Sequence, residues 1–164
     1  LVLNPFEEEV KALPTYPSLW LWPESVAGVY SEPPTLAPMA QYSTKQRVVL
    51  TKDDFSGEPL PLAAIYVLAP VHETGASTIS LTRLPPRDAC MAIDENSFQL
   101  DLTGTRRAAA MLAKAAKVAK QVPAFSLSYP RDFALLPSVR AAILDQRSSE
   151  TRCAAPGPSG ESHG

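Results

Sequence analysis

Lys45 and Arg47 are the residues whose types and spacing best suit binding chemistry in this sequence. They lie two positions apart in the run Lys-Gln-Arg-Val-Val-Leu-Thr, which is typical of a β-strand, so both side chains are expected on one face. Two fixed cations can hold phosphate oxygens, most effectively where water is excluded. The other interpretation is a solvated strand edge, where lysine guards against aggregation.

Carboxylates, the ligand type that Mg²⁺ prefers, occur in two polar stretches. Asp53 and Asp54 fall in an expected loop, and residues 7–9 form a run of glutamates. Magnesium requires oxygen ligands in a convergent arrangement. Neither stretch imposes one, so we interpret both as solvated turns and predict no metal site.

The sequence shows no nucleophile and base in a catalytic arrangement. His72 is expected in a loop over residues 71–77, and His163 in the C-terminal tail. Cys90 lies in an apolar helix and is interpreted as a packed thiol. Cys153 is too far from it to suggest a zinc site, and a structural disulfide between the two is the less favoured interpretation, which fits a reducing compartment. We therefore predict no catalytic residues in this chain.

Length and charge narrow the class of protein. The chain has 164 residues, 45% hydrophobic content, 20% charged residues and a net charge of −2, which suits a globular domain with its own core. Without an excess of positive charge, we expect neither nucleic acid nor a membrane surface as partner. No run approaches the roughly 18 apolar residues of a membrane span, and no signal peptide is evident, so we expect a cytoplasmic protein.

The elements that position these residues follow from apolar periodicity and from the 17 prolines, which divide the chain into short pieces. We expect strands at residues 1–3, 10–13, 45–51, 63–68, 78–84 and 124–129, and helices at residues 23 onward, 85–93, 106–122 and 135–144. Residues 31–44 are expected to be irregular. The continuous apolar run over residues 63–68 predicts a strand buried on both faces.

Residues 106–122 give the clearest helix, with an apolar stripe and an opposite basic face. The basic face consists of Arg106, Arg107, Lys114, Lys117 and Lys120. This face is interpreted as solvated, or alternatively as a docking surface for an acidic partner. Further along, Arg131 and Asp132 are expected to form an ion pair in a loop. We place the domain at residues 1–145 and a disordered tail at residues 146–164, where apolar content is low.

The stretch Thr15–Glu24 contains both tryptophans of the chain. Trp20 and Trp22 are two positions apart, so they lie on one side of an extended segment, and their rings favour burial. Pro17 and Pro23 fix the backbone on either side. From residue types alone we interpret this stretch as a wedge that packs a loop onto the core.

Four stretches, in this order, resemble segments of bacterial proteins related to HPr kinase/phosphorylase. Residues 16–24, Tyr-Pro-Ser-Leu-Trp-Leu-Trp-Pro-Glu, resemble the segment after the Walker B strand, although position 20 is usually polar or basic there. The others resemble a buried strand, a helix start, and a closing strand with a Pro-Arg-Asp loop; they are residues 59–68, 84–89 and 123–137. The resemblance covers about residues 1–145. It implies a fold similar to the nucleotide-binding half of phosphoenolpyruvate carboxykinase.

This resemblance also implies what relatives use and what this chain lacks. Full-length relatives use ATP and Mg²⁺ to phosphorylate a serine hydroxyl of a protein or peptide, and often carry a basic pair at the positions of Lys45 and Arg47. Their phosphate-binding loop, Gly-x-x-x-x-Gly-Lys-[Ser/Thr], has no counterpart here, because none of the seven glycines precedes a lysine. Residues 1–3 resemble the stretch after the acidic residues that hold magnesium.

Two hypotheses follow, both with an α/β fold in which a mixed sheet is flanked by helices. In the first, the chain is part of an HPr-kinase-like ATP-dependent serine phosphotransferase and is inactive alone. In the second, it is a non-catalytic module, derived from that fold, that binds a protein or peptide. An unpaired strand edge would also favour self-association.

Overall fold

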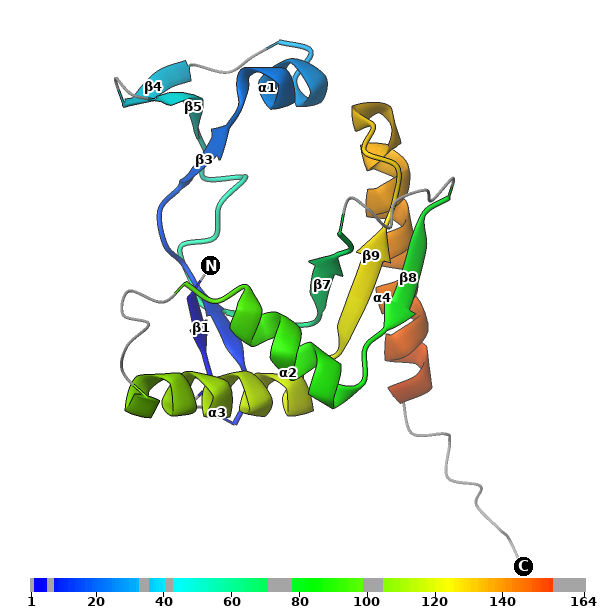
Figure 1. Ribbon diagram of the computed structural model, residues 1–164. Coiled ribbons are helices and arrows are strands. Elements are labelled where there is room, and N and C mark those ends of the chain that lie inside the picture. Colours follow the sequence, from blue (N-terminus) through cyan, green and yellow to red (C-terminus); the bar gives the residue numbers. More distant parts are fainter. Residues whose placement is uncertain are drawn as a thin grey trace, which may run out of the picture.

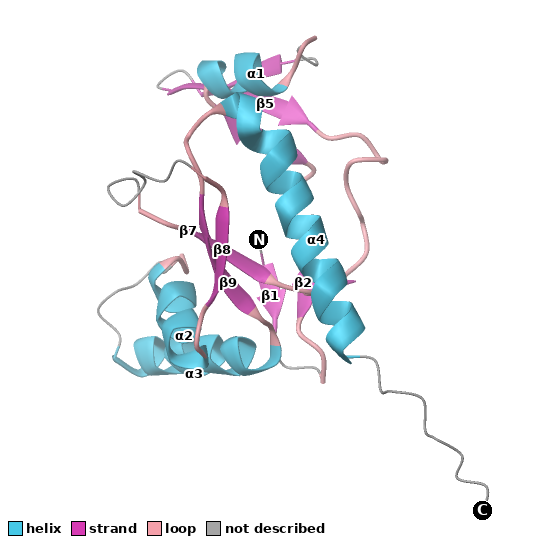
Figure 2. Cartoon of the chain, turned by 90° about the vertical axis from the view of Figure 1, so that its right-hand side faces the viewer, coloured by secondary structure: helices cyan, strands magenta, loops and turns pink. Residues whose placement is uncertain are grey.

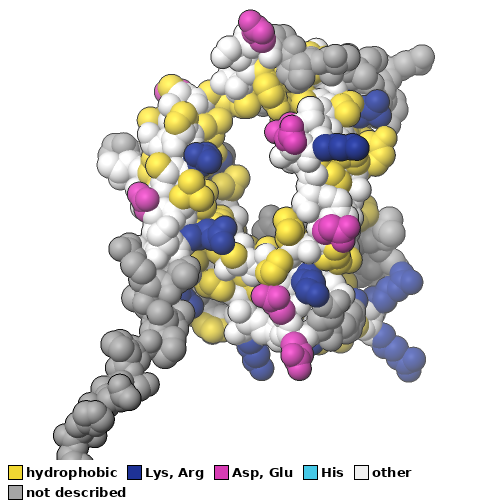
Figure 3. Space-filling model, turned by 180° about the vertical axis from the view of Figure 1, so that it is seen from behind, with side chains coloured by type: hydrophobic (Ala, Val, Ile, Leu, Met, Phe, Trp, Pro, Cys, Tyr) yellow, Lys and Arg dark blue, Asp and Glu magenta, His cyan; other side chains and the backbone are white. Residues whose placement is uncertain are grey.

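The computed structural model describes residues 2–5, 8–32, 36–40, 43–70, 78–98 and 105–154. Within these residues the chain forms three three-stranded sheets and four α-helices, so the expected mixed α/β class is confirmed. The elements surround a central opening, which is seen between the ribbons in Figure 1 and through the space-filling view in Figure 3.

The first sheet joins the start of the chain to its middle. Its order is β1 (Val2–Asn4), β2 (Lys11–Leu13) and β6 (Leu60–Pro61), with both pairs antiparallel. The two strands expected at residues 1–3 and 10–13 thus pair with each other. The amide of Leu62 donates to the carbonyl of Val10 at 2.9 Å, which extends the contact beyond β6.

The second sheet has the order β3 (Ser18–Leu21), β5 (Ser43–Val49) and β4 (Leu36–Ala40). The prediction that residues 31–44 are irregular is wrong for β4 and for the start of β5. Pro38 does not prevent pairing, because β4 is an edge strand, where a missing amide donor is tolerated. Residues 31–32 are irregular as expected, and residues 33–35 and 41–42 lie outside the described ranges.

The third sheet has the order β7 (Ile65–Leu68), β9 (Ala124–Ser128) and β8 (Ser80–Arg83). β7 is parallel to β9, and β8 is antiparallel to it. The prediction of a strand buried on both faces at residues 63–68 is wrong, because β7 lies at the sheet edge and Leu68 is 52% exposed. The central, buried strand is β9. The loop expected at residues 71–77 lies outside the described residues.

Prolines set three helix boundaries, as expected. Pro23 opens α1 (Pro23–Val29), Pro86 opens α2 (Pro86–Glu95), and Pro123 follows the end of α3 (Thr105–Gln121). Proline suits the first helical position because its missing N–H would have no helical partner there.

The core lies where α2 and α3 cover the first and third sheets. One buried cluster consists of Val10, Val118 and Val122, and the other of Ala89, Ala119 and Ala124. Ile65 and Ile93 pack against both clusters and join them. Only the second half of α3 is buried in this way, since Leu112 stays largely exposed.

The last helix is longer than predicted. After the 3-10 helix η2 (Phe133–Leu135), α4 (Leu136–Ala154) continues past residue 145, where we expected order to end. Low apolar content does not prevent the helix. Ser148 and Ser149 lie within it, and their hydroxyls donate to the carbonyls of Leu144 and Asp145 at 3.0 and 2.9 Å. Figure 2 shows α4 running along most of the molecule. Residues 155–164 lie outside the described ranges.

The end of the molecule that carries the second sheet contacts η2 through a glycine. A Cβ atom added to Gly28 in α1 would lie within contact distance of three ring carbons of Phe133. The absence of a side chain at Gly28 therefore allows α1 and η2 to pack closely, and this contact closes one side of the central opening (Figure 1).

We expect Gly28→Ala to lower the free energy of unfolding by about 1 kcal/mol, measured by urea denaturation. Displacing the Phe133 ring costs about 1–3 kcal/mol, against a gain in helix propensity of about 1 kcal/mol. Gly57→Ala is the matched control, because nothing lies within 4 Å of its added Cβ. Equal destabilisation in both variants, or no recovery when Phe133→Leu is combined with Gly28→Ala, would contradict this contact.

Candidate functional site

One face of the second sheet gathers the aromatic and basic residues singled out in the sequence. Trp20 lies directly opposite Arg47 in the β3–β5 pair, and alternation along β5 places Lys45 on the same face. The set consists of Tyr16, Trp20, Trp22, Lys45 and Arg47, which we call the aromatic–cationic face. The structure thus brings the predicted basic pair together with the tryptophan segment.

Lys45 is held against an aromatic ring. Its Nζ atom lies 4.7 Å from the centroid of the Trp22 ring, at the entrance to α1. A cation–π contact of this kind contributes about 0.5–1 kcal/mol at a partly exposed site. The contact orients the ammonium group while leaving its N–H donors available.

Arg47 has one weak bond and one unused donor. Its Nη1 atom donates to the Tyr16 hydroxyl at 3.5 Å, the long limit for a hydrogen bond. Its Nε atom is buried without a partner in the described structure. A buried donor left without an acceptor costs about 1–3 kcal/mol. The guanidinium is therefore arranged for an acceptor that the described residues do not supply.

The tryptophans are not the buried wedge that residue types predicted. Trp20 is 51% exposed and Trp22 is 50% exposed, while Val48 on the opposite face of β5 is 2% exposed. The face that carries the aromatic residues is thus open to solvent, whereas on the opposite face Val48 is buried and its partner Leu19 is 43% exposed. The indole N–H of Trp20 has only a local partner, the Ser18 hydroxyl at 3.3 Å.

The face is positively charged. Among the described residues, neither Lys45 nor Arg47 forms a salt bridge. Asp54 instead accepts from the Thr51 hydroxyl at 2.7 Å in the turn after β5. Asp54 is thus engaged within this turn rather than paired with Lys45 or Arg47.

A hollow of about 470 Å³ adjoins the aromatic–cationic face. It lies where the amide of Leu50 donates to the carbonyl of Pro17 at 3.0 Å, immediately after Tyr16 in the chain. Its lining consists of Pro17, Leu50, Thr51, Lys52, Phe55 and Gly57. Neither Lys45 nor Arg47 lines this hollow, which adjoins the face only at its Tyr16 end.

Other residues considered in the sequence do not assemble into a site. The described residues contain no cluster of His, Cys, Asp and Glu suited to a metal ion. On α3, four of the five basic side chains are exposed, while Lys117 is partly buried. Cys90 is a free thiol that contacts the Leu112 carbonyl at 3.9 Å. His72, His163 and the Cys153 side chain lie outside what the structure describes.

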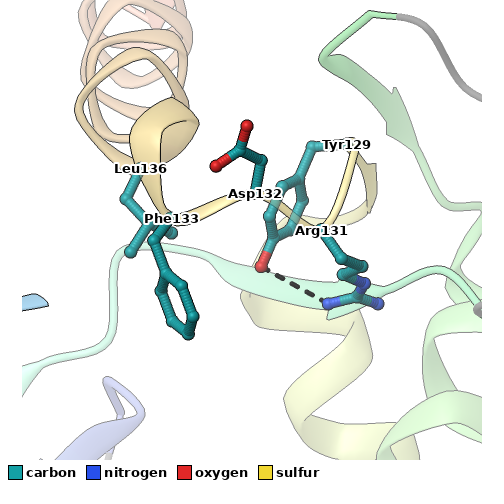
Figure 4. A pocket seen from close by; sticks show the side chains of 5 residues that line it. All are labelled: Tyr129, Arg131, Asp132, Phe133 and Leu136. Carbon is teal, nitrogen blue, oxygen red and sulfur yellow. Dashed lines mark hydrogen bonds between the residues drawn. The ribbon is translucent and has the colours of Figure 1, made fainter. Parts of the chain in front are cut away.

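A pocket at the end of β9 was missed by sequence reasoning. It has a volume of about 150 Å³ and is lined by Tyr129, Arg131, Asp132, Phe133 and Leu136 (Figure 4). The expected ion pair between Arg131 and Asp132 is wrong. Arg131 donates to Tyr129 and to the Ala69 carbonyl, while Asp132 accepts from the Ala134 amide and caps η2.

No protein-family model, curated protein or solved structure matches this chain. Its candidate function is therefore argued from the geometry of its own residues. None of the helices in the described part of the chain is long and apolar enough to cross a membrane.

We expect Arg47→Met to raise the free energy of unfolding by about 1 kcal/mol, measured by chemical denaturation. Methionine keeps much of the side-chain volume and removes the buried donor that lacks a partner. The control is Lys52→Met, at an exposed position, where a change within about 0.5 kcal/mol is expected. A marked loss of stability in Arg47→Met alone would mean that Arg47 serves the fold rather than a ligand.

Proposed function

We propose that this chain is part of an HPr-kinase-like phosphotransferase domain and that Lys45 and Arg47 bind a phosphate group. The observation that carries the proposal is the convergence of two cations and three aromatic side chains on one sheet face, with a buried Arg47 donor that lacks an acceptor. Phosphate oxygens suit both residues, since arginine offers a planar fork of donors and lysine a compact charge.

Three of the four stretches that resemble the kinase family support this proposal by their places in the fold; residues 59–68, which resemble a buried strand, instead form the short strand β6 and the edge strand β7. Residues 16–24 form β3 and the start of α1, and residues 59–68 form β6 and β7. Residues 84–89 lead into α2, and residues 123–137 form β9, η2 and the start of α4. Each resembling stretch therefore coincides with a strand, a helix start or both.

The aromatic residues have supporting roles in this site. Trp22 fixes the position of the Lys45 ammonium, and Tyr16 restrains one end of the Arg47 guanidinium. A phosphate held between the two cations would satisfy the buried Nε donor and exchange water for charge-assisted hydrogen bonds. In such a domain ATP supplies the phosphoryl group. We assign no magnesium ligand to the described residues.

We expect the chain alone to release no phosphate from Mg·ATP above the rate of a Lys45→Ala/Arg47→Ala variant. Phosphoryl transfer depends on a phosphate-binding loop with its lysine and on metal-holding acids, and the glycine-lysine motif is not in this sequence. A phosphate-release assay measures the rate. Hydrolysis well above that of the double variant would contradict the expectation that this chain is inactive alone.

We expect the chain to bind pyrophosphate, measured by calorimetry at low salt. The Lys45→Ala/Arg47→Ala variant should bind pyrophosphate about tenfold or more weakly, because each hydrogen bond to a charged group is worth about 1.5–3 kcal/mol. The matched control is Arg87→Ala/Arg106→Ala, which removes the same charge from exposed positions on α2 and α3. An equal effect of both double variants would indicate nonspecific attraction.

The second candidate function is a non-catalytic module that binds a protein or peptide. The exposure of Trp20 and Trp22 favours it, because tryptophan, tyrosine and arginine are enriched where interfaces bind most tightly. The two functions differ in what the face recognises. The second function is favoured if the chain does not bind pyrophosphate but does bind an acidic polypeptide, and if Trp20→Ala abolishes that binding. Self-association through an exposed sheet edge stays a prediction of the sequence.

A further inference from the structure

The carboxyl ends of two parallel strands meet beside the pocket at β9. Leu68 of β7 is paired with Leu127 of β9, and the Ala69 amide donates to the Leu127 carbonyl at 2.9 Å. Arg131 extends this junction, because its Nη2 atom donates to the Ala69 carbonyl at 3.0 Å. In α/β sheets, ligands bind preferentially outside the carboxyl ends of parallel strands.

The Arg131 guanidinium is fixed before any ligand arrives. Its Nη1 atom donates to the Tyr129 hydroxyl at 3.3 Å, and its Cζ atom lies 5.0 Å from the centroid of the Tyr129 ring. A guanidinium has more N–H donors than these bonds use. Asp132 is turned away from it in Figure 4 and is held by the Ala134 amide at 2.9 Å. Arg131 therefore presents donors for an anion at a defined place.

The rest of the lining is apolar. The rings of Tyr129 and Phe133 and the side chain of Leu136 surround the space beside the charged groups (Figure 4). A cavity of about 150 Å³ is large enough to hold a benzene-sized group. The lining thus combines one oriented cation, apolar walls suited to a flat group, and the Asp132 carboxylate, which is engaged by the Ala134 amide.

We propose that this pocket binds a small organic anion, with its carboxylate on Arg131 and its flat apolar body between Tyr129, Phe133 and Leu136. The site is separate from the aromatic–cationic face and stands independently of the proposed phosphotransferase function. Phe133 also contacts Gly28, so the ligand would lie where α1 meets η2. Junctions between packed units are common places for small-molecule sites.

The test is a titration of the full chain with benzoate, followed by backbone amide NMR shifts. Saturable shifts are expected at residues 129–136. Acetate, which has the carboxylate alone, and benzyl alcohol, which has the ring alone, should each bind more weakly than benzoate. Equal binding of acetate and benzoate, or shifts spread over the whole surface, would overturn the proposal.

Two variants and one control locate the site. Arg131→Gln should weaken benzoate binding about tenfold or more, since it removes a charge-assisted contact. Leu136→Trp should abolish binding by filling the pocket while leaving the bonds of Arg131 in place. Arg140→Gln, at an exposed position on α4, should bind as the parent chain does. If Arg131→Gln loses its folded spectrum, Leu136→Trp decides, and unchanged binding in that variant overturns the site.

Discussion

The packing of the second half of α3 is the interaction on which the rest of the structure depends. Val118 and Val122 meet Val10 beside the first sheet, while Ala119 meets Ala124 at the start of β9. These small side chains let the helix approach both sheets closely. Ile65 and Ile93 pack against both clusters and join them into a single core. The first and third sheets therefore keep one relative position.

Local rules predicted much of the secondary structure but not the order of the strands. Pro23, Pro86 and Pro123 mark helix boundaries because their effect lies in their own backbone. The apolar run that forms β7 is as hydrophobic as a central strand, yet β9 takes the central place. Strand order depends on which segments the helices bring together. The residue types at positions 63–68 do not indicate this order.

The candidate site, like the fold, was predictable from the sequence only in part. Alternation along one strand was enough to place Lys45 and Arg47 on one face. The exposure of the tryptophans was not predictable, because it depends on which face of the second sheet receives cover. The pocket at β9 depends on Arg131 reaching Ala69, a contact 62 residues apart in the chain. Asp132, its neighbour in sequence, satisfies the closer amide of η2 instead.

Arg47 illustrates how a binding residue differs from a structural one. A side chain kept for stability usually has all of its buried donors paired. Arg47 keeps one donor unpaired and reaches Tyr16 only at the limit of hydrogen bonding. In the free protein this donor is already removed from water without a partner, which costs free energy. A ligand that accepts a hydrogen bond from it would recover that free energy on binding.

The contact between Gly28 and Phe133 affects how another molecule could enter or leave the central opening. The covalent chain does not form a closed ring. It encircles the central opening because α1 packs against η2. An elongated molecule lying in the opening would have to slide out end first, or wait until that contact parts. The lifetime of a packed phenylalanine against a glycine would then set the residence time of such an occupant.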